Sequence, residues 1–206
     1  MGLTAEQLKV SLDALAAREP VFAEALARAG YPEPRIREPG YETLLRTIVG
    51  QQVSVAAAAS MWNKLEAALD GRTADPEAML SRSDEQLRAA GMSRQKSGYL
   101  KSLAGLVASA ELDLAHLPED DEEAIAQLTR IKGIGRWSAE IYLLFAEGRP
   151  DIWPAGDLAV MREVGVLLSL PERPDEKQTR ELAETWRPHR GAAAIFAWHH
   201  YKMVAI

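Results

Sequence analysis

The sequence predicts an all-α protein. Apolar residues recur at helical spacing over nearly the whole chain of 206 residues. No segment shows strict alternation with the Val, Ile and Tyr enrichment that a strand needs. Local start signals agree with helices: Thr4 and Gln7 have the spacing of a capping box. So do Ser83 and Gln86, and Asp75 is followed by a proline at an expected first helical position.

Periodicity and turn signals place about a dozen short helices along the chain. In order, the expected ranges are 4–17, 20–29, 41–50, 54–69, 76–81, 84–90, 94–110, 121–130, 135–147, 158–169, 175–186 and 191–203. Proline, glycine and acidic residues mark the connections at 30–40, 70–76, 116–121, 148–156 and 170–175. None of these connections is long enough to be a flexible tether between domains, so we expect a compact helical bundle.

Composition limits the classes of function. The chain has no cysteine, which excludes disulfides, zinc-thiolate sites and cysteine-ligated iron–sulfur clusters. A formal net charge of −6 and a pI near 5.3 argue against indiscriminate coating of nucleic acid but leave room for a small basic surface. There is no apolar run of membrane-spanning length, and the N-terminus is amphipathic, unlike a secretory signal. We therefore expect a cytoplasmic protein with no membrane partner.

The segment LTRIKGIGRWSAEIYLLF, residues 128–145, places two glycines at the start of an expected helix. The first amides of a helix have no intrahelical partner and its dipole favours negative charge, so such a start can bind an anion. The alternative is a tight turn in which glycine only supplies a positive φ, and Gly-x-Gly alone does not separate the two. Three cations flank the glycines: Arg130, Lys132 and Arg136. They favour contact with phosphate, without reading of bases.

Asp157 follows the loop DIWPAG and precedes the periodic segment LAVMREVGVLL, so we expect it to be a helix N-cap. Trp153 and Pro154 stand just ahead of it. A carboxylate beside an aromatic wall could stabilise a developing cation, whereas a cap alone is the simpler interpretation. The two roles are compatible, because a helix N-terminus favours the ionised carboxylate.

Three other side chains occupy unusual positions. Trp137 lies in the first turn of the helix after the glycines, where it can face a ligand or pack in the core. Gln51 and Gln52 interrupt an apolar run, which is costly if they are buried without partners. We expect them to face a cleft or a ligand, with an ordinary surface position as the alternative. The four histidines have no metal-ligand spacing, and no metal is assigned to them.

These segments together resemble the helix-hairpin-helix DNA glycosylase superfamily, and within it the 3-methyladenine DNA glycosylase II branch of alkylation-repair enzymes. Asp157 lies 22 positions after Gly135, as in the Gly/Pro…Asp signature of that superfamily. Residues 48–65, 91–104 and 185–202 also match. Larger bacterial members carry an additional N-terminal α/β domain, so the resemblance indicates a compact form without it.

The resemblance implies two helical lobes with an active-site cleft between them. The middle lobe is expected at 41–150, with the helix-hairpin-helix at about 121–147, and the second lobe combines 1–40 with 151–206. The implied activity is that of a monofunctional glycosylase that flips and excises alkylated bases, such as cationic 3-methyladenine-type purines, leaving an abasic site in base excision repair. The implied partner is duplex DNA with damaged bases. A monomer is expected, associated with the nucleoid if the source is bacterial.

The resemblance also implies roles for individual residues. Asp157 is expected to stabilise the positive charge that develops on the sugar, and Trp137 and Trp198 match aromatic positions of the cleft. The base pocket is completed by Gln51, Ile141 and Leu158, the last two standing where relatives can carry tyrosine. Gln52 matches the intercalating position, where larger relatives use an apolar wedge. The expected DNA contacts are Gln52, Lys132, Gly133, Ile134, Gly135, Arg136 and Ser138.

One position distinguishes the reaction types in this superfamily. Bifunctional glycosylase-lyases carry a nucleophilic lysine directly after Gly-x-Gly-Arg, and the residue here is Trp137. The lack of cysteine excludes the cluster of endonuclease III-like enzymes. No cofactor is required, although a Na⁺ or K⁺ could be held by three backbone carbonyls, those of Thr129, Ile131 and Ile134.

Two alternatives stay open at this point. One is a non-catalytic helix-hairpin-helix module that binds damaged DNA, in which Asp157 is only a cap. The other is a glycosylase-lyase for oxidised bases. It also stays open whether three further cations contact phosphate: Arg94, Lys96 and Arg190.

Overall fold

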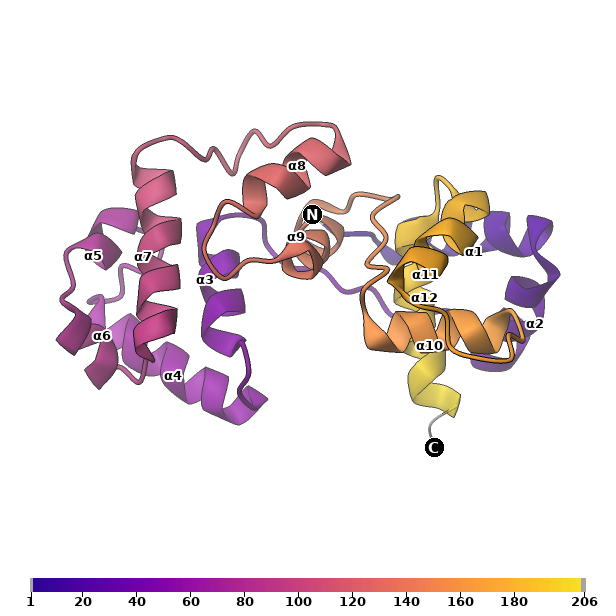
Figure 1. Cartoon of the computed structure of the whole chain (residues 1–206), viewed down its shortest axis with the longest axis horizontal. Helices are drawn as coiled ribbons and strands as arrows, with labels where there is room; N and C mark the ends of the chain where they lie inside the picture. The colour runs from indigo at the N-terminus through magenta and orange to yellow at the C-terminus, as the bar shows by residue number, and fades with distance from the viewer. Residues whose placement is uncertain (1, 205–206) are drawn as a thin grey trace. The chain divides into compact units, whose positions relative to one another are not determined.

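The computed structural model describes residues 2–204, and this part of the chain is helical without any strand (Figure 1). The predicted all-α class is confirmed. The chain divides into two compact units, which we call the terminal unit (Met1–Glu38 with Glu140–Ile206) and the middle unit (Pro39–Ala139). Residues 140–150, expected in the middle lobe, group with the terminal unit. Within residues 2–204, no helix has both the length and the apolar character needed to cross a membrane.

The middle unit is built around one central helix. Its elements are α3 (Tyr41–Gly50), α4 (Val55–Ala68), α5 (Pro76–Leu80), α6 (Asp84–Ala89), α7 (Arg94–Ala108), α8 (Asp121–Leu128) and the start of α9 (Arg136–Tyr142). Helix α7 packs against α3, α5 and α6 (Figure 1). Its buried residues Ser97, Leu100, Leu103 and Ala104 stand at positions i, i+3, i+6 and i+7, as expected for one helix face.

The terminal unit is organised around α12. Its elements are α1 (Ala5–Arg18), α2 (Pro20–Ala29), the π-helix η1 (Leu143–Glu147), α10 (Leu158–Leu167), α11 (Glu176–Leu182), the 3₁₀-helix η2 (Ala183–Trp186) and α12 (Arg190–Val204). Helix α12 contacts α1, α2 and α10, and every residue from Ala192 to Trp198 is buried. Small alanines in this run let the neighbouring helices approach closely. Phe22 closes the core against Trp186 and Phe196, with ring centroids 5.1 and 6.0 Å away.

The predicted helix starts are confirmed. Thr4 and Ser83 each complete a capping box, and Asp75 accepts a hydrogen bond from the amide two residues later. Each of the expected helices has a counterpart in the structure, because local caps and apolar periodicity specify short amphipathic helices well.

The expected helix 135–147 is interrupted. After α9 the chain widens into the π-helix η1, where the amides of Gly148 and Arg149 both bond to the carbonyl of Leu143. The Phe145 carbonyl instead accepts the amide of Arg37 at 2.8 Å. The wider turn thus provides an acceptor for a segment distant in sequence, and periodicity alone does not reveal such a bond.

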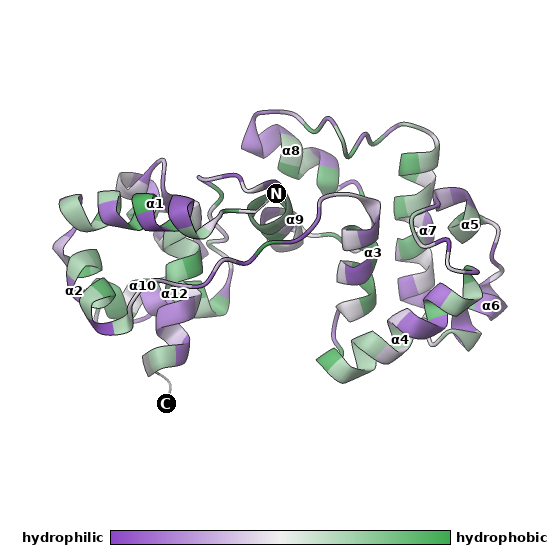
Figure 2. Cartoon of the chain, turned by 180° about the vertical axis from the view of Figure 1, so that it is seen from behind, coloured by the Kyte–Doolittle hydropathy of each residue, from purple (hydrophilic) through white to green (hydrophobic). Residues whose placement is uncertain are grey.

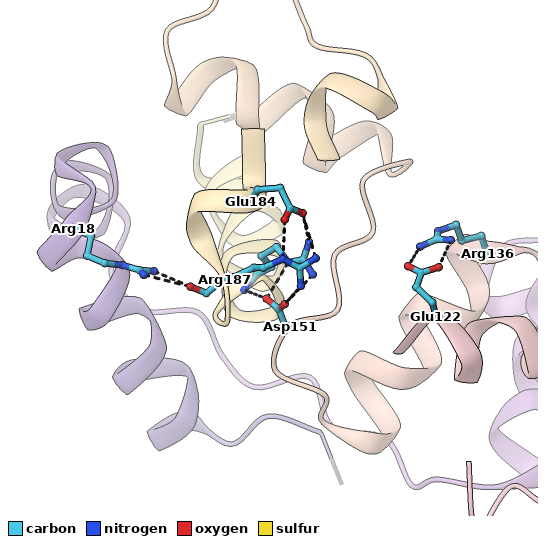
Figure 3. Close-up of polar contacts among 7 residues, drawn as sticks. Arg18, Glu122, Arg136, Asp151, Glu184 and Arg187 are labelled. Carbon is cyan, nitrogen blue, oxygen red and sulfur yellow. Dashed lines mark hydrogen bonds and ion pairs between the residues drawn. The ribbon is translucent and has the colours of Figure 1, made fainter. Parts of the chain in front are cut away.

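A charged cluster holds the loop before α10 to the start of α12 (Figure 3). Asp151 accepts two hydrogen bonds from the guanidinium of Arg190, at 2.9 and 2.8 Å, and one from that of Arg187 at 2.5 Å. Glu184 accepts from the same two arginines at 2.9 and 2.8 Å. The hydrogen bonds from Arg187 are the main reason why the pKa of Glu184 lies below its usual value. Because Arg190 is 8% exposed, its charge depends on these two acids.

We predict that Asp151→Ala destabilises the protein by about 3 kcal/mol, because it leaves a buried arginine with one fewer acid. Urea unfolding at neutral pH measures the loss. Glu181→Ala is the control, since the Glu181 side chain is 67% exposed and lies 4.0 Å from Lys177. The control should change stability by less than about 0.5 kcal/mol. Equal effects of both substitutions would contradict a structural role for the cluster.

Candidate active site

The hairpin turn between α8 and α9 requires glycine at one of its two glycine positions. Gly133 has φ +87°, and a Cβ there would lie 2.1 Å from a ring carbon of Tyr99. The positive φ considered from the sequence is therefore present, together with a close contact. Gly135 differs, since a Cβ there would meet nothing within 4 Å. The backbone is thus open on the side of Gly135, as an approaching ligand requires.

The turn is held in place by α3 and α7. Gln51 is partly buried, and its Nε2 donates to the Gly133 carbonyl at 2.7 Å. The amide of Lys132 donates to Ser102 Oγ at 3.2 Å. Lys96 donates to the Val49 carbonyl near the end of α3 at 2.6 Å, and burial lowers the pKa of this lysine. The amide of Gln51, placed in the base pocket by resemblance, thus supports the hairpin in this structure.

The cations around the glycines differ in their partners. Arg136 forms a two-pronged ion pair with Glu122 at 2.8 and 2.5 Å (Figure 3), and Arg130 pairs with Glu111 at 3.0 Å. For Lys132, which is exposed, residues 2–204 supply no acidic partner. Among these three cations, Lys132 is therefore the one best able to meet an external phosphate. The sequence also left open whether two further arginines contact phosphate. Arg190 belongs to the Asp151 cluster, and Arg94 is exposed.

The loop between α3 and α4 has an unusual backbone. Gln52 is exposed and has φ +57°, a left-handed conformation that costs a non-glycine residue on the order of 1 kcal/mol. Val53 and Val55 beside it are 38% and 89% exposed, and the apolar start of α4 is visible in Figure 2. A strained loop that exposes apolar side chains is a candidate contact surface.

Asp157 caps α10, as predicted, and its carboxylate has a further partner. Oδ1 accepts hydrogen bonds from the amides of Ala159 and Val160 at 2.9 and 3.0 Å. The same oxygen accepts from Trp198 Nε1 at 3.1 Å. Three donors on one oxygen fix the orientation of the carboxylate, and the indole donor comes from a helix 41 positions further along the chain.

The aromatic neighbour of Asp157 differs from the sequence-based expectation. Trp153 turns into the core, where its Nε1 donates to the Thr179 carbonyl at 3.1 Å and its ring packs against Trp186. Trp198, which is 9% exposed, lies beside the carboxylate instead. Its ring packs against Phe145, with centroids 5.6 Å apart.

One charged residue at this position is not predicted by the sequence. The guanidinium of Arg35 lies 5.3 Å from the centroid of the Trp198 ring. Arg35 belongs to a proline-rich connection, and no local pattern distinguishes it from the other charges in that loop.

The remaining predicted site residues fall into two sets, one in each unit. In the terminal unit, Leu158 follows Asp157 and is 65% exposed, while Ile141 is 7% exposed. In the middle unit, Trp137 is 47% exposed in the first turn of α9, and Ile134 is buried under the turn. Ser138 is partly buried one residue after Trp137. The structure thus joins Asp157 with Trp198, and Gln51 with the hairpin turn.

Comparisons with known proteins agree with this geometry. Residues 45–188 match the family described as HhH-GPD superfamily base excision DNA repair protein. DNA-3-methyladenine glycosylase 1 of Schizosaccharomyces pombe is 35% identical over 170 residues, covering 81% of this chain and 74% of that protein. A crystal structure of DNA-3-methyladenine glycosidase from Bacillus halodurans has a TM-score of 0.88 at 28% identity and covers 95% of this chain and 90% of that one. The S. pombe 3-methyladenine DNA glycosylase Mag1 in complex with abasic DNA has a TM-score of 0.75 at 29% identity, covering 95% and 97%.

The family match spans the hairpin and Asp157. The similarity to the S. pombe protein likewise extends over most of both chains. The resemblance inferred from two motifs at a fixed spacing is therefore confirmed, and this chain belongs to the HhH-GPD superfamily of base excision DNA repair proteins.

Proposed function

We propose that this protein is a monofunctional DNA glycosylase that excises alkylated bases from duplex DNA. It hydrolyses the N-glycosidic bond and leaves an abasic site. The observation that carries the proposal is the Asp157 carboxylate, which three hydrogen bonds hold in one orientation beside Trp198. The glycosylase names of the relatives support the same class of reaction.

The carboxylate suits the charge that develops in this reaction. As the bond between base and sugar breaks, the sugar gains positive charge, and a fixed negative group stabilises that state without having to reorganise. Water then adds to the sugar carbon that the nucleobase has left. The proton that the water loses passes to a proton acceptor such as the carboxylate. An indole donor on Asp157 Oδ1 keeps the carboxylate oriented during these steps.

The middle unit supplies the proposed DNA-binding residues. A target base must leave the stack before it can be excised, which costs a few kcal/mol and is easiest for a damaged base. We assign Gln52 to the gap that the base leaves, because this exposed side chain stands on the strained loop before α4. The hairpin turn, with Lys132 and the open backbone at Gly135, is assigned to the phosphates.

A monovalent cation fits the same turn. Among residues 2–204, the carbonyls of Thr129 and Ile134 accept no backbone hydrogen bond outside the helices, while the carbonyl of Ile131 accepts the amide of Ile134 at 3.0 Å. Carbonyl oxygens with lone pairs to spare are suitable ligands for Na⁺ or K⁺. A cation held there would contribute positive charge towards a phosphate.

The main alternative is a non-catalytic helix-hairpin-helix module that binds damaged DNA, with Asp157 acting only as a cap. The Trp198 contact favours the enzyme, because the two amide bonds already satisfy the requirements of an N-cap. An additional buried donor is more useful for holding a carboxylate that reacts.

The first test of this function is Asp157→Asn. Asparagine caps a helix about as well as aspartate, so the fold should persist while base release from duplex containing 3-methyladenine or ethenoadenine falls by about 10²–10³-fold. Single-turnover release of free base measures the rate. The matched control is Asp175→Asn, which changes the N-cap of α11 in the same way.

Two outcomes would count against the assignment. If Asp157→Asn releases base as fast as the unchanged protein, Asp157 does not take part in the reaction. If the unchanged protein binds lesion DNA but releases no base from any lesion, the non-catalytic module is correct.

A second test concerns the position of the lyase lysine. Trp137 cannot form a Schiff base with the sugar, so borohydride should trap no covalent protein–DNA complex while base release proceeds. Gel electrophoresis of the borohydride-treated reaction shows whether an adduct forms. A trapped complex would support the glycosylase-lyase alternative.

A third test concerns the phosphate grip. Lys132→Gln should weaken binding to duplex DNA and reduce the slope of log K against log salt concentration by about 0.9, the value for one lost phosphate contact. Lys177→Gln on α11 is the control, because this lysine is 86% exposed and lies outside the hairpin. Fluorescence anisotropy at several salt concentrations gives both slopes, and equal slopes for the two variants would remove Lys132 from the interface.

A further inference from the structure

The aromatic face beside Asp157 already has a cation from the protein itself. The Arg35 guanidinium lies 5.3 Å from the centroid of the Trp198 ring and 5.9 Å from that of Phe145. Trp198 in turn donates to the Asp157 carboxylate. Arginine, indole and carboxylate therefore form one contiguous group in the terminal unit, which we call the Arg35 group.

The guanidinium of Arg35 is partly buried but has no fixed acceptor. Over residues 2–204, no hydrogen bond or ion pair engages this side chain. Burial is the main reason why the pKa of Arg35 lies below its usual value, and the charge of Arg37 acts in the same direction. The charge of Asp157 opposes both effects, so the two charges interact through the site. Arginine has five N–H donors, and those of Arg35 are available to a ligand.

The backbone that carries Arg35 is held in place. Two residues further on, the amide of Arg37 donates to the Phe145 carbonyl at 2.8 Å. Gly2 packs against the same segment so closely that a Cβ there would lie 3.0 Å from the Arg35 carbonyl and 2.5 Å from the Phe145 carbonyl. Contacts on both sides keep the arginine beside the Trp198 ring.

We propose that Arg35 is a specificity-determining residue that reduces the preference of the site for cationic bases relative to neutral alkylated bases. The proposal rests on the function proposed above, with the excised base entering beside Asp157 and Trp198. A positive charge at this position repels a cationic base. The Arg35 guanidinium also occupies the aromatic face that would otherwise attract a cationic base. A neutral base with a ring-nitrogen acceptor meets no repulsion and can accept a hydrogen bond from the guanidinium.

A phosphate contact is the competing role for Arg35. A phosphate-binding arginine is usually exposed and free to reach the DNA backbone. Arg37 is exposed in this way, whereas Arg35 is partly buried against two aromatic rings. Burial against the aromatic wall therefore favours contact with the base.

The test compares two lesions in the same duplex sequence. Release of a cationic base, 3-methyladenine or 7-methylguanine, is measured against release of neutral ethenoadenine under single-turnover conditions. Arg35→Gln should raise the cationic-to-neutral ratio of rates by about tenfold, because it removes the repelling charge. Arg35→Lys keeps the charge and should stay near the original ratio. Arg37→Gln is the control and should leave the ratio unchanged, since Arg37 is exposed and lies over the ring of Phe145, at 5.7 Å.

The outcomes distinguish the role of Arg35 from the proposed glycosylase function. A ratio of rates within one variant cancels any general loss of folding or of Asp157 reactivity. If the unchanged protein releases base and Arg35→Gln leaves the cationic-to-neutral ratio of rates unchanged, the proposed role of Arg35 is wrong, while the proposed glycosylase function is retained. Arg35→Gln could instead weaken binding of both lesions and of undamaged duplex without changing the ratio of rates. That result would make Arg35 a phosphate contact and would also overturn the proposal. If the unchanged protein releases neither base, the proposed function itself fails.

Discussion

The hydrogen bond from the Trp198 indole to the Asp157 carboxylate is the contact on which the candidate site in the terminal unit depends. It joins the first residue before α10 to the middle of α12, so the position of α12 sets the position of the carboxylate. Helix α12 can come this close because its alanines are buried among α1, α2 and α10. The Asp151 cluster fixes the beginning of α12 to the loop that leads into α10. The core thus orients a reactive group as well as stabilising the fold.

The cations around the hairpin in the middle unit have two different roles. Of the three cations around the hairpin glycines, Arg130 and Arg136 pair with acids and stiffen the motif, and Lys132 is left to interact outwards. A chain with a net charge of −6 gains little free energy from undamaged DNA. Discrimination between normal and damaged nucleotides then depends mainly on the cost of flipping and on the base pocket.

Local signals predicted the features that depend on neighbouring residues. The capping boxes of Thr4 and Ser83 and the N-cap at Asp157 follow from side chains within three positions of the amides they bind, so the sequence is sufficient. Features set by tertiary contacts were not predictable in this way. Trp153 is near Asp157 in sequence but packs in the core, whereas Trp198 reaches the carboxylate from 41 positions away. The π-helix after α9 and the position of Arg35 both involve the distant Arg37–Phe145 backbone bond, which leaves no local pattern.

The Arg35 group links substrate charge to the chemistry of the leaving group. A base that is already cationic leaves readily, so a carboxylate that stabilises the sugar provides most of the help it needs. A neutral base leaves with negative charge unless something donates to it, and a guanidinium beside the base can stabilise that charge through a hydrogen bond. One arginine therefore weakens the binding of bases that need little assistance and assists those that need more. An electrostatic balance of this kind, between Asp157 and Arg35 across one indole ring, would broaden the range of alkylated bases that a single pocket can process.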